Sequence, residues 1–164
     1  MIRALTLAAC LALGGCGLKP MYAGGSSGVV ASSLSSIQVA PIPERAGWLV
    51  RNALVDRLHG ESSNPSYRLE VELDDDLTGF GIRGDSAVTR ERRILRARYR
   101  LVDLESGQVV LDATAGSDAG IDVVSSEYAT VAAEQTAQER LASVIADQMV
   151  SRLSLFVRNR ARGQ

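Results

Sequence analysis

Regular alternation of apolar and charged residues in two segments restricts the folds open to this chain more than any other feature. In YRLEVELD (67–74), Tyr67, Leu69, Val71 and Leu73 alternate with charged residues. RILRARYRLVDL (93–104) repeats the alternation, with arginines along its polar side. Because successive side chains of a β-strand point to opposite faces, each segment predicts a strand with one face in a core and the other in water.

Two further strands are predicted on either side of these segments. SIQVAPIP (36–43) predicts a short strand that prolines end, and VVLDATAG (109–116) predicts a strand that follows the turn ESGQ. Between the alternating segments, DDLTGFGIRGDS (75–86) contains three glycines. We expect residues 75–86 to form a long, mobile loop, because glycine and aspartate favour turns.

Two amphipathic helices accompany the predicted strands. In ERAGWLVRNALVDRLHG (44–60), Val50, Leu54 and Leu58 recur at helical spacing, and Gly60 is typical of a helix end. A longer helix is predicted from about Ser126 to Arg158, and its first half is rich in alanine. Its second half carries an apolar stripe of Leu141, Val144, Ile145, Met149, Leu153 and Phe156.

The predicted order is a strand, a helix, a meander of three strands and a long helix. A sheet with apolar side chains on one face needs that face covered, and two amphipathic helices can cover it. We expect an α+β fold in the form of a two-layer sandwich. Its sheet would have about four, mostly antiparallel strands and would be covered on one face by two helices. The roughly 149 residues after position 15 suffice for one domain with a sizeable core.

The N-terminus has the features of a secretory signal. Arg3 supplies a positive charge, and residues 4–13 are apolar but too few to span a bilayer as a helix. LGGC (13–16) resembles the bacterial lipobox, in which the cysteine becomes the lipidated first residue of the mature protein. An ordinary signal peptide with an incidental cysteine is the alternative. Gly17 follows Cys16, where an aspartate would resemble an inner-membrane retention signal, so the outer membrane is favoured.

Composition shifts divide the chain. AGGSSGVVASSLSS (23–36) is rich in glycine and serine, as flexible tethers are. We therefore expect a signal peptide (1–15), a lipidated N-terminus with a flexible tether (16–35), a single α/β domain (36–158) and a basic C-terminal tail (159–164). Lipidation of Cys16 and removal of Cys10 with the signal would leave the mature chain without a disulfide.

The charge balance and the scarcity of reactive groups exclude several classes of function. The chain has 18 basic and 19 acidic residues, which argues against a nucleic-acid partner. His59 is the only histidine and lies at the end of the first predicted helix, so a Ser–His–Asp site would depend on it alone. DDD (74–76) lacks the spacing of a calcium loop and is more typical of a solvated strand end. We expect no enzymatic activity, no metal and no cofactor; a periplasmic hydrolase would require His59 beside a reactive serine.

Arginines form the one unusual constellation. On an extended strand Arg90, Arg92, Arg96, Arg98 and Arg100 share one face. Arg96, Arg98 and Arg100 have a purely structural explanation, because they could form cross-strand ion pairs with the acidic residues on the polar face of 67–74. Residues nearer the glycine-rich segment are candidates for charge-assisted contacts with a polyanion: Arg83, Arg90, Arg92 and Arg93.

The order of these features resembles a known family. CGLKPMY (16–22), the strands containing RLEVEL and RARYRLVD, and YATVAAEQTAQERLASVIADQMVSRLSLF (128–156) are similar to the LPS-assembly lipoproteins of the LptE family, in their alphaproteobacterial form. The resemblance covers essentially the whole mature chain. It implies an α/β sandwich anchored in the inner leaflet of the outer membrane. It also implies a complex with the LptD β-barrel, in which the protein sits as a plug and assists lipopolysaccharide passage to the cell surface.

Members of the family are described as binding lipopolysaccharide through basic residues. We assign that role by chemistry to Arg83, Arg90, Arg92 and Arg93. The alternative function is an outer-membrane lipoprotein that serves a lipid-trafficking ABC transport system and binds no barrel.

Overall fold

The computed structural model of the protein describes residues 29–59, 63–82 and 88–163. Within these ranges none of the helices is long and apolar enough to cross a bilayer. The expected signal peptide (1–15) and the expected lipidation site, Cys16, lie outside the described residues. The elements follow in the order α2 (Val29–Leu34), β1 (Ile37–Val39), α3 (Glu44–Arg57), β2 (Tyr67–Ile82), β3 (Val88–Asp103), β4 (Val109–Asp122) and α4 (Glu127–Arg162).

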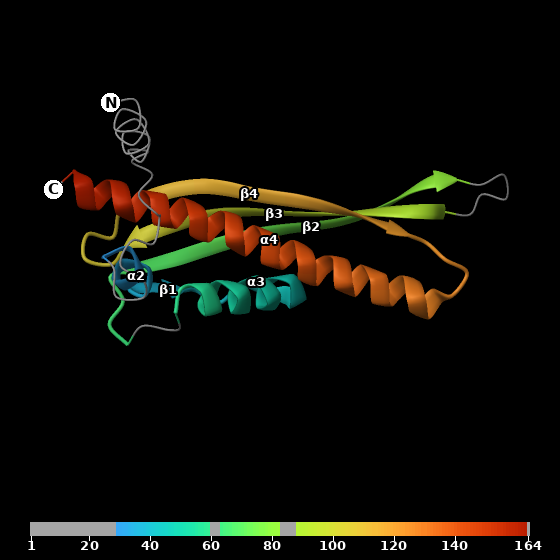
Figure 1. Ribbon diagram of the computed structural model, residues 1–164, viewed down its shortest axis with the longest axis horizontal. Helices are drawn as coiled ribbons and strands as arrows, with labels where there is room; N and C mark the ends of the chain where they lie inside the picture. Colours follow the sequence, from blue (N-terminus) through green and yellow to red (C-terminus); the bar gives the residue numbers. More distant parts are fainter. Residues whose placement is uncertain (1–28, 60–62, 83–87, 164) are drawn as a thin grey trace, which may run out of the picture.

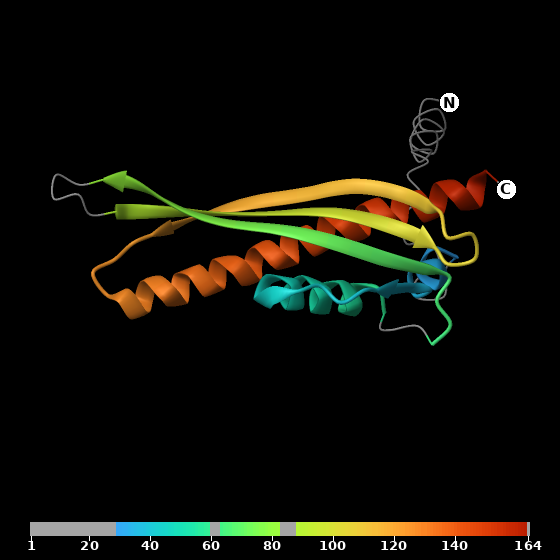
Figure 2. The same cartoon turned by 180° about the vertical axis from the view of Figure 1, so that it is seen from behind.

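The strands form one mixed sheet in the order β1-β2-β3-β4. Short β1 pairs parallel with β2, and the three long strands pair antiparallel with their neighbours. Helix α3 and the much longer α4 lie on the same side of the sheet, and α4 crosses it obliquely (Figures 1 and 2). The expected α+β sandwich, with a four-stranded sheet covered on one face by two helices, is confirmed.

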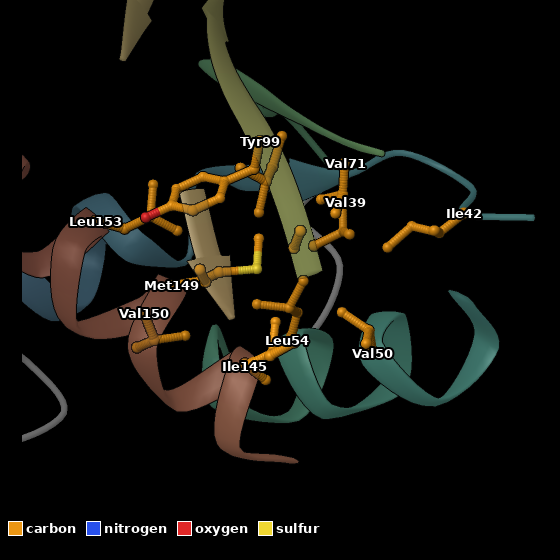
Figure 3. Close-up of a cluster of buried hydrophobic side chains, with 14 of the residues drawn as sticks. Val39, Ile42, Val50, Leu54, Val71, Tyr99, Ile145, Met149, Val150 and Leu153 are labelled. Carbon is orange, nitrogen blue, oxygen red and sulfur yellow. The ribbon is translucent and has the colours of Figure 1, made fainter. Parts of the chain in front are cut away.

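The apolar core fills the space between this helix-covered face and the two helices (Figure 3). Leu54 of α3, Leu101 of β3 and Met149 of α4 are completely shielded from solvent. Burial of each large apolar side chain contributes about 1.5–3 kcal/mol to the stability of the fold. The core thereby fixes which face of each strand turns inward.

Polar side chains replace this core at the distal end of the molecule, where β2 ends at Ile82 and β3 begins at Val88. Between this end and the core, the first half of α4 buries small and polar residues, among them Ala137, Thr130 and Gln138. Gln138 donates a hydrogen bond to Asp75 Oδ2 of β2 at 2.8 Å. Thr130 accepts a hydrogen bond from the backbone N–H of Val124, in the connection between β4 and α4. Polar contacts therefore link helix and sheet at this end.

The expected loop over residues 75–86 is wrong for residues 75–82, which continue β2 to Ile82. Nearly every one of these residues has an antiparallel partner on β3, from Asp75 with Leu95 to Ile82 with Val88. Pairing with a distant strand outweighs the local turn preference of glycine and aspartate. Asp75 is largely shielded from solvent rather than part of a solvated strand end.

Three smaller differences concern the ends of helices. Residues 29–34, expected within the flexible tether, form α2 and bury Ala31 and Leu34. Helix α4 continues to Arg162, into the expected C-terminal tail. Helix α3 ends at Arg57, and the left-handed conformation that often follows a helix falls on His59, with φ 67°, while Gly60 lies outside the described residues.

Candidate functional site

The face of the sheet that the helices leave uncovered, called the outer face below, is dominated by arginine. Inward-facing Leu95, Ala97, Tyr99 and Leu101 of β3 are buried. The residues that alternate with them, from Arg90 to Arg100, point outward, and β3 pairs with both neighbouring strands without a shift in register over this range. The predicted shared face of β3 is therefore confirmed, with Arg90, Arg92, Arg96, Arg98 and Arg100 along it and Ile94 among them.

Carboxylates of β4 line one side of this arginine row. Arg90 Nε lies 3.0 Å from Asp122 Oδ1, and Arg92 Nε lies 3.1 Å from Asp118 Oδ2. Both pairs are more than half exposed, and exposed ion pairs contribute only about 0–1 kcal/mol each. The ion pairs of Arg90 and Arg92 are therefore formed but weak.

Carboxylates of β2 line the other side. Arg96 pairs with Asp74 at 3.7 Å, and Arg100 lies 3.5 Å from Glu70 and 3.4 Å from Glu72. These are the cross-strand ion pairs expected from the sequence. They make the outer face a mixed-charge surface rather than a basic patch.

Arg98 departs from the expected pairing. Its direct neighbour on β2 is Glu72, yet its guanidinium makes two hydrogen bonds to Asp112 of β4, with an Nη2–Oδ2 distance of 2.9 Å. These hydrogen bonds raise the pKa of Arg98 and lower the pKa of Asp112. A groove of about 670 Å³ crosses this part of the sheet, and its lining includes Glu72, Asp74, Arg96, Arg98 and Thr114.

Arg93 lies apart from Arg90 and Arg92, on the helix-covered face. It donates from Nε to Asp75 Oδ1 at 2.8 Å and from Nη2 to Asp75 Oδ2 at 2.7 Å. Gln138 of α4 donates a third hydrogen bond to Asp75 Oδ2, at 2.8 Å. Burial by itself would raise the pKa of Asp75, but the hydrogen bonds from Arg93 and Gln138 hold it below its ordinary value.

Glu91 is a second charged residue on the helix-covered face of β3, and we did not anticipate it. Its Oε2 atom is buried without a hydrogen-bond partner among the described residues. Burial, followed by the nearby carboxylate of Glu134 on α4, raises the pKa of Glu91. The sequence did carry a signal, because Glu91 and Arg93 occupy the inward positions of the alternation that Leu95 continues.

Of the four predicted polyanion-binding residues, the structure thus brings only Arg90 and Arg92 together. Arg93 lies behind them under α4, and Arg83 lies outside the described residues. No group of three or more residues suited to hold a metal ion occurs within residues 29–59, 63–82 and 88–163. His59 is exposed just after α3.

Two solved structures with a similar fold are of proteins described as lipoproteins. A Caulobacter crescentus CB15 protein described as a lipoprotein is 29% identical, with a TM-score of 0.68 over 81% of this chain and 98% of that chain. The rare lipoprotein B of Shewanella oneidensis shares the fold at 8% identity, with a TM-score of 0.59 over 75% of this chain and 96% of that one.

Sequence comparison identifies the family. The LptE family, described as lipopolysaccharide-assembly, matches residues 34–153, and the chain belongs to this family. The uncharacterized protein RP188 of Rickettsia prowazekii (strain Madrid E) is 28% identical over 147 residues, which cover 90% of this chain and 92% of the relative. The family we expected from the sequence is confirmed, and the protein is a lipopolysaccharide-assembly lipoprotein.

Proposed function

We propose that the protein is a non-enzymatic lipoprotein of the outer membrane that forms a complex with the LptD β-barrel, sits in it as a plug, and assists lipopolysaccharide assembly at the cell surface. The observation that carries the proposal is the outer face. It presents five arginines between two rows of carboxylates on one sheet. Because the interiors of outer-membrane barrels are polar, a surface of paired charges is suited to contact such a wall.

Cys16 would anchor the protein to the periplasmic face of the outer membrane. It precedes the first described residue, Val29, by 13 positions. One acyl chain binds a membrane only marginally, so stable anchoring requires several chains or a second attachment. A multiply acylated cysteine together with a barrel partner would provide both.

Lipopolysaccharide binding is assigned to Arg83, Arg90, Arg92 and Arg93. Arg90 and Arg92 support this assignment best, because their carboxylate partners are exposed and phosphate can compete for the guanidinium groups with short, charge-assisted hydrogen bonds. Arg93 is held on the helix-covered face by Asp75, which also accepts a hydrogen bond from Gln138. A substitution of Arg93 would therefore disturb folding as well as any lipid contact.

The test of the plug is purification of the tagged, lipidated protein from outer membranes in mild detergent, followed by mass identification of bound proteins. We expect a large β-barrel at one copy per copy of the protein. Recovery of a periplasmic or inner-membrane transport component without a barrel would overturn the proposal. That result would favour a role in a lipid-trafficking ABC system.

Lipid contact is tested separately with purified lipopolysaccharide and the double variant Arg90→Gln, Arg92→Gln. We expect weaker binding by this variant and unchanged recovery of the barrel. Arg96→Gln with Arg98→Gln is the matched control, because it removes two arginines of the same row farther from the distal end. Equal lipopolysaccharide binding by the wild type and the Arg90/Arg92 variant would contradict the assignment of these two arginines. It would not affect the proposal that the protein is a plug in the barrel.

A further inference from the structure

One edge of the sheet is open over most of its length. Strand β1 pairs with β2 only at Tyr67, Arg68 and Leu69, and the last contact is the backbone N–H of Ala40 donating to the Leu69 carbonyl at 2.9 Å. Pro41 and Pro43 follow, and proline has no N–H with which to extend the pairing. No described strand lies beside β2 on this side after Leu69.

The backbone groups along this edge have a defined direction. N–H and C=O groups of successive strand residues point to alternate sides, and the Leu69 carbonyl points toward β1. Val71, Leu73, Asp75, Leu77 and Gly79 therefore turn their backbone groups to the open edge, while the residues between them bond to β3. Such a row of unpaired groups is a template for another strand.

Negative charge accumulates beside the open edge. On the outer face β2 carries Glu70, Glu72, Asp74 and Asp76. Arg98 has turned away to Asp112, and Ile94 rather than an arginine lies opposite Asp76. The side chains of Glu72 and Asp74 remain 70% and 72% exposed.

The opposite edge of the sheet, along β4, is already engaged. Gln148 of α4 donates to the carbonyl of Gly116 and accepts from its N–H, both at 3.2 Å. The side-chain amide thereby takes the place that a neighbouring peptide group would occupy. Helix α4 also packs along β4, so the two edges differ in access (Figure 2).

We propose that the edge of β2 from Val71 to Gly79 binds an extended segment of a partner protein that carries basic residues at alternate positions. The segment would add a fifth strand, and its basic side chains would lie opposite Glu72, Asp74 and Asp76 on the outer face. This arrangement continues the alternation of acidic β2, basic β3 and acidic β4. A second copy of this chain does not fit, because both edges of its sheet are acidic and like charges opposite one another repel.

The test uses the mature protein and a fluorescein-labelled synthetic peptide of five Lys-Thr repeats, with a Glu-Thr peptide for comparison. Fluorescence anisotropy gives the affinities. Combined Glu72→Gln, Asp74→Asn and Asp76→Asn should weaken Lys-Thr binding about tenfold, since three cross-strand charge pairs are lost. The matched control, Asp112→Asn with Asp118→Asn and Asp122→Asn, removes three outer-face carboxylates from β4 and should change the affinity by less than about twofold.

Amide hydrogen exchange measured by NMR gives an independent signature. The Lys-Thr peptide should slow exchange at Leu73, Asp75 and Leu77, whereas Glu72 and Asp74 are already bonded to β3 and should not change. Equal weakening by both triple variants would show general electrostatic attraction and would overturn the proposal. Absence of binding, equal binding of the Glu-Thr peptide, or new protection along β4 would also overturn it, and the acids would then serve only to prevent self-pairing.

Discussion

Arg93 of β3 and Asp75 of β2 form a two-point ion pair beneath α4, with nitrogen–oxygen distances of 2.7 and 2.8 Å. Only 16% and 13% of their side chains are exposed. Gln138 completes the network from the helix, so one buried carboxylate joins two strands and α4. The distal part of the helix is held to the sheet through this carboxylate.

Asp75→Asn should destabilise the protein by roughly 1.5–3 kcal/mol, the range for a hydrogen bond to a charged group. The folded-state pKa of Asp75 lies below its ordinary value of 3.8. Its contribution is therefore complete above pH 3.8 and is lost as the pH falls through the lower folded-state pKa. Urea denaturation between pH 7 and pH 2.5 measures both effects.

The control for this experiment is Asp74→Asn. Asp74 is the next residue on the strand, but its pair with Arg96 is exposed and 3.7 Å long. A loss of less than about 1 kcal/mol is expected. If the two variants were equally stable, the buried pair would not be what attaches α4 at this end.

Glu91→Gln should change the stability of the fold in the opposite direction from Asp75→Asn. Burial and Glu134 raise the pKa of Glu91 above its ordinary 4.5, so the fold favours the neutral carboxyl. The stability that this preference contributes is fully present below pH 4.5 and is lost as the pH rises through the folded-state pKa. A glutamine stays neutral, so the variant should be more stable than the wild type at pH 7.5.

This gain should disappear below pH 4.5, where Glu91 is protonated in both states. Paired urea titrations at pH 4 and pH 7.5 supply the comparison. Glu105→Gln, in the exposed turn between β3 and β4, is the control and should show no such difference. A variant less stable than the wild type at pH 7.5 would mean that the Glu91 carboxylate has a partner that stabilises its charge.

Gly47→Ala should destabilise the protein although alanine favours helices. A β-carbon at Gly47 of α3 would lie 2.6 Å from the carbonyl oxygen of Ile42, and backbone cannot move aside as a side chain can. Overpacking of this kind costs about 1–3 kcal/mol. Thermal unfolding followed by circular dichroism gives the change, and Gly120→Ala, which meets no atom within 4 Å, should not lower the midpoint.

Gln148→Ala removes both hydrogen bonds to Gly116 and should cost about 1 kcal/mol. The amide of Gly116 should then exchange faster, because its N–H is left to solvent. Gln135→Ala, at an exposed position of the same helix, has the same intrinsic helix preference and is the control. Unchanged exchange at Gly116 would show that Gln148 does not protect the β4 edge.

Local periodicity was sufficient to predict the strands around Leu69 and Leu101 and the helices around Leu54 and Met149. Each of these residues is buried at the position that the alternation or the helical stripe indicates. The pattern is readable because one face of every such element lies in the core. The long continuation of β2 was missed because its stability comes from pairing with β3 rather than from its own residues.

The candidate site was predicted in part for the same reason. Alternation places Arg90 and Arg92 on one face with Arg96, and that is where they lie. The same alternation places Arg93 on the other face, although its position in the chain suggested a group with Arg90 and Arg92. Its burial requires α4, which lies more than thirty residues farther along the chain.

The sequence by itself determined the family, the two layers and the face to which each side chain of the long strands turns, because side-chain direction along a strand follows from the backbone geometry of each residue. Only the tertiary structure decided which charges meet. Arg98 pairs with Asp112 instead of Glu72, and Asp75 with Arg93 under Gln138, because register and helix placement bring together residues that are far apart in the chain. The same packing covers β4 and leaves the acidic edge of β2 open.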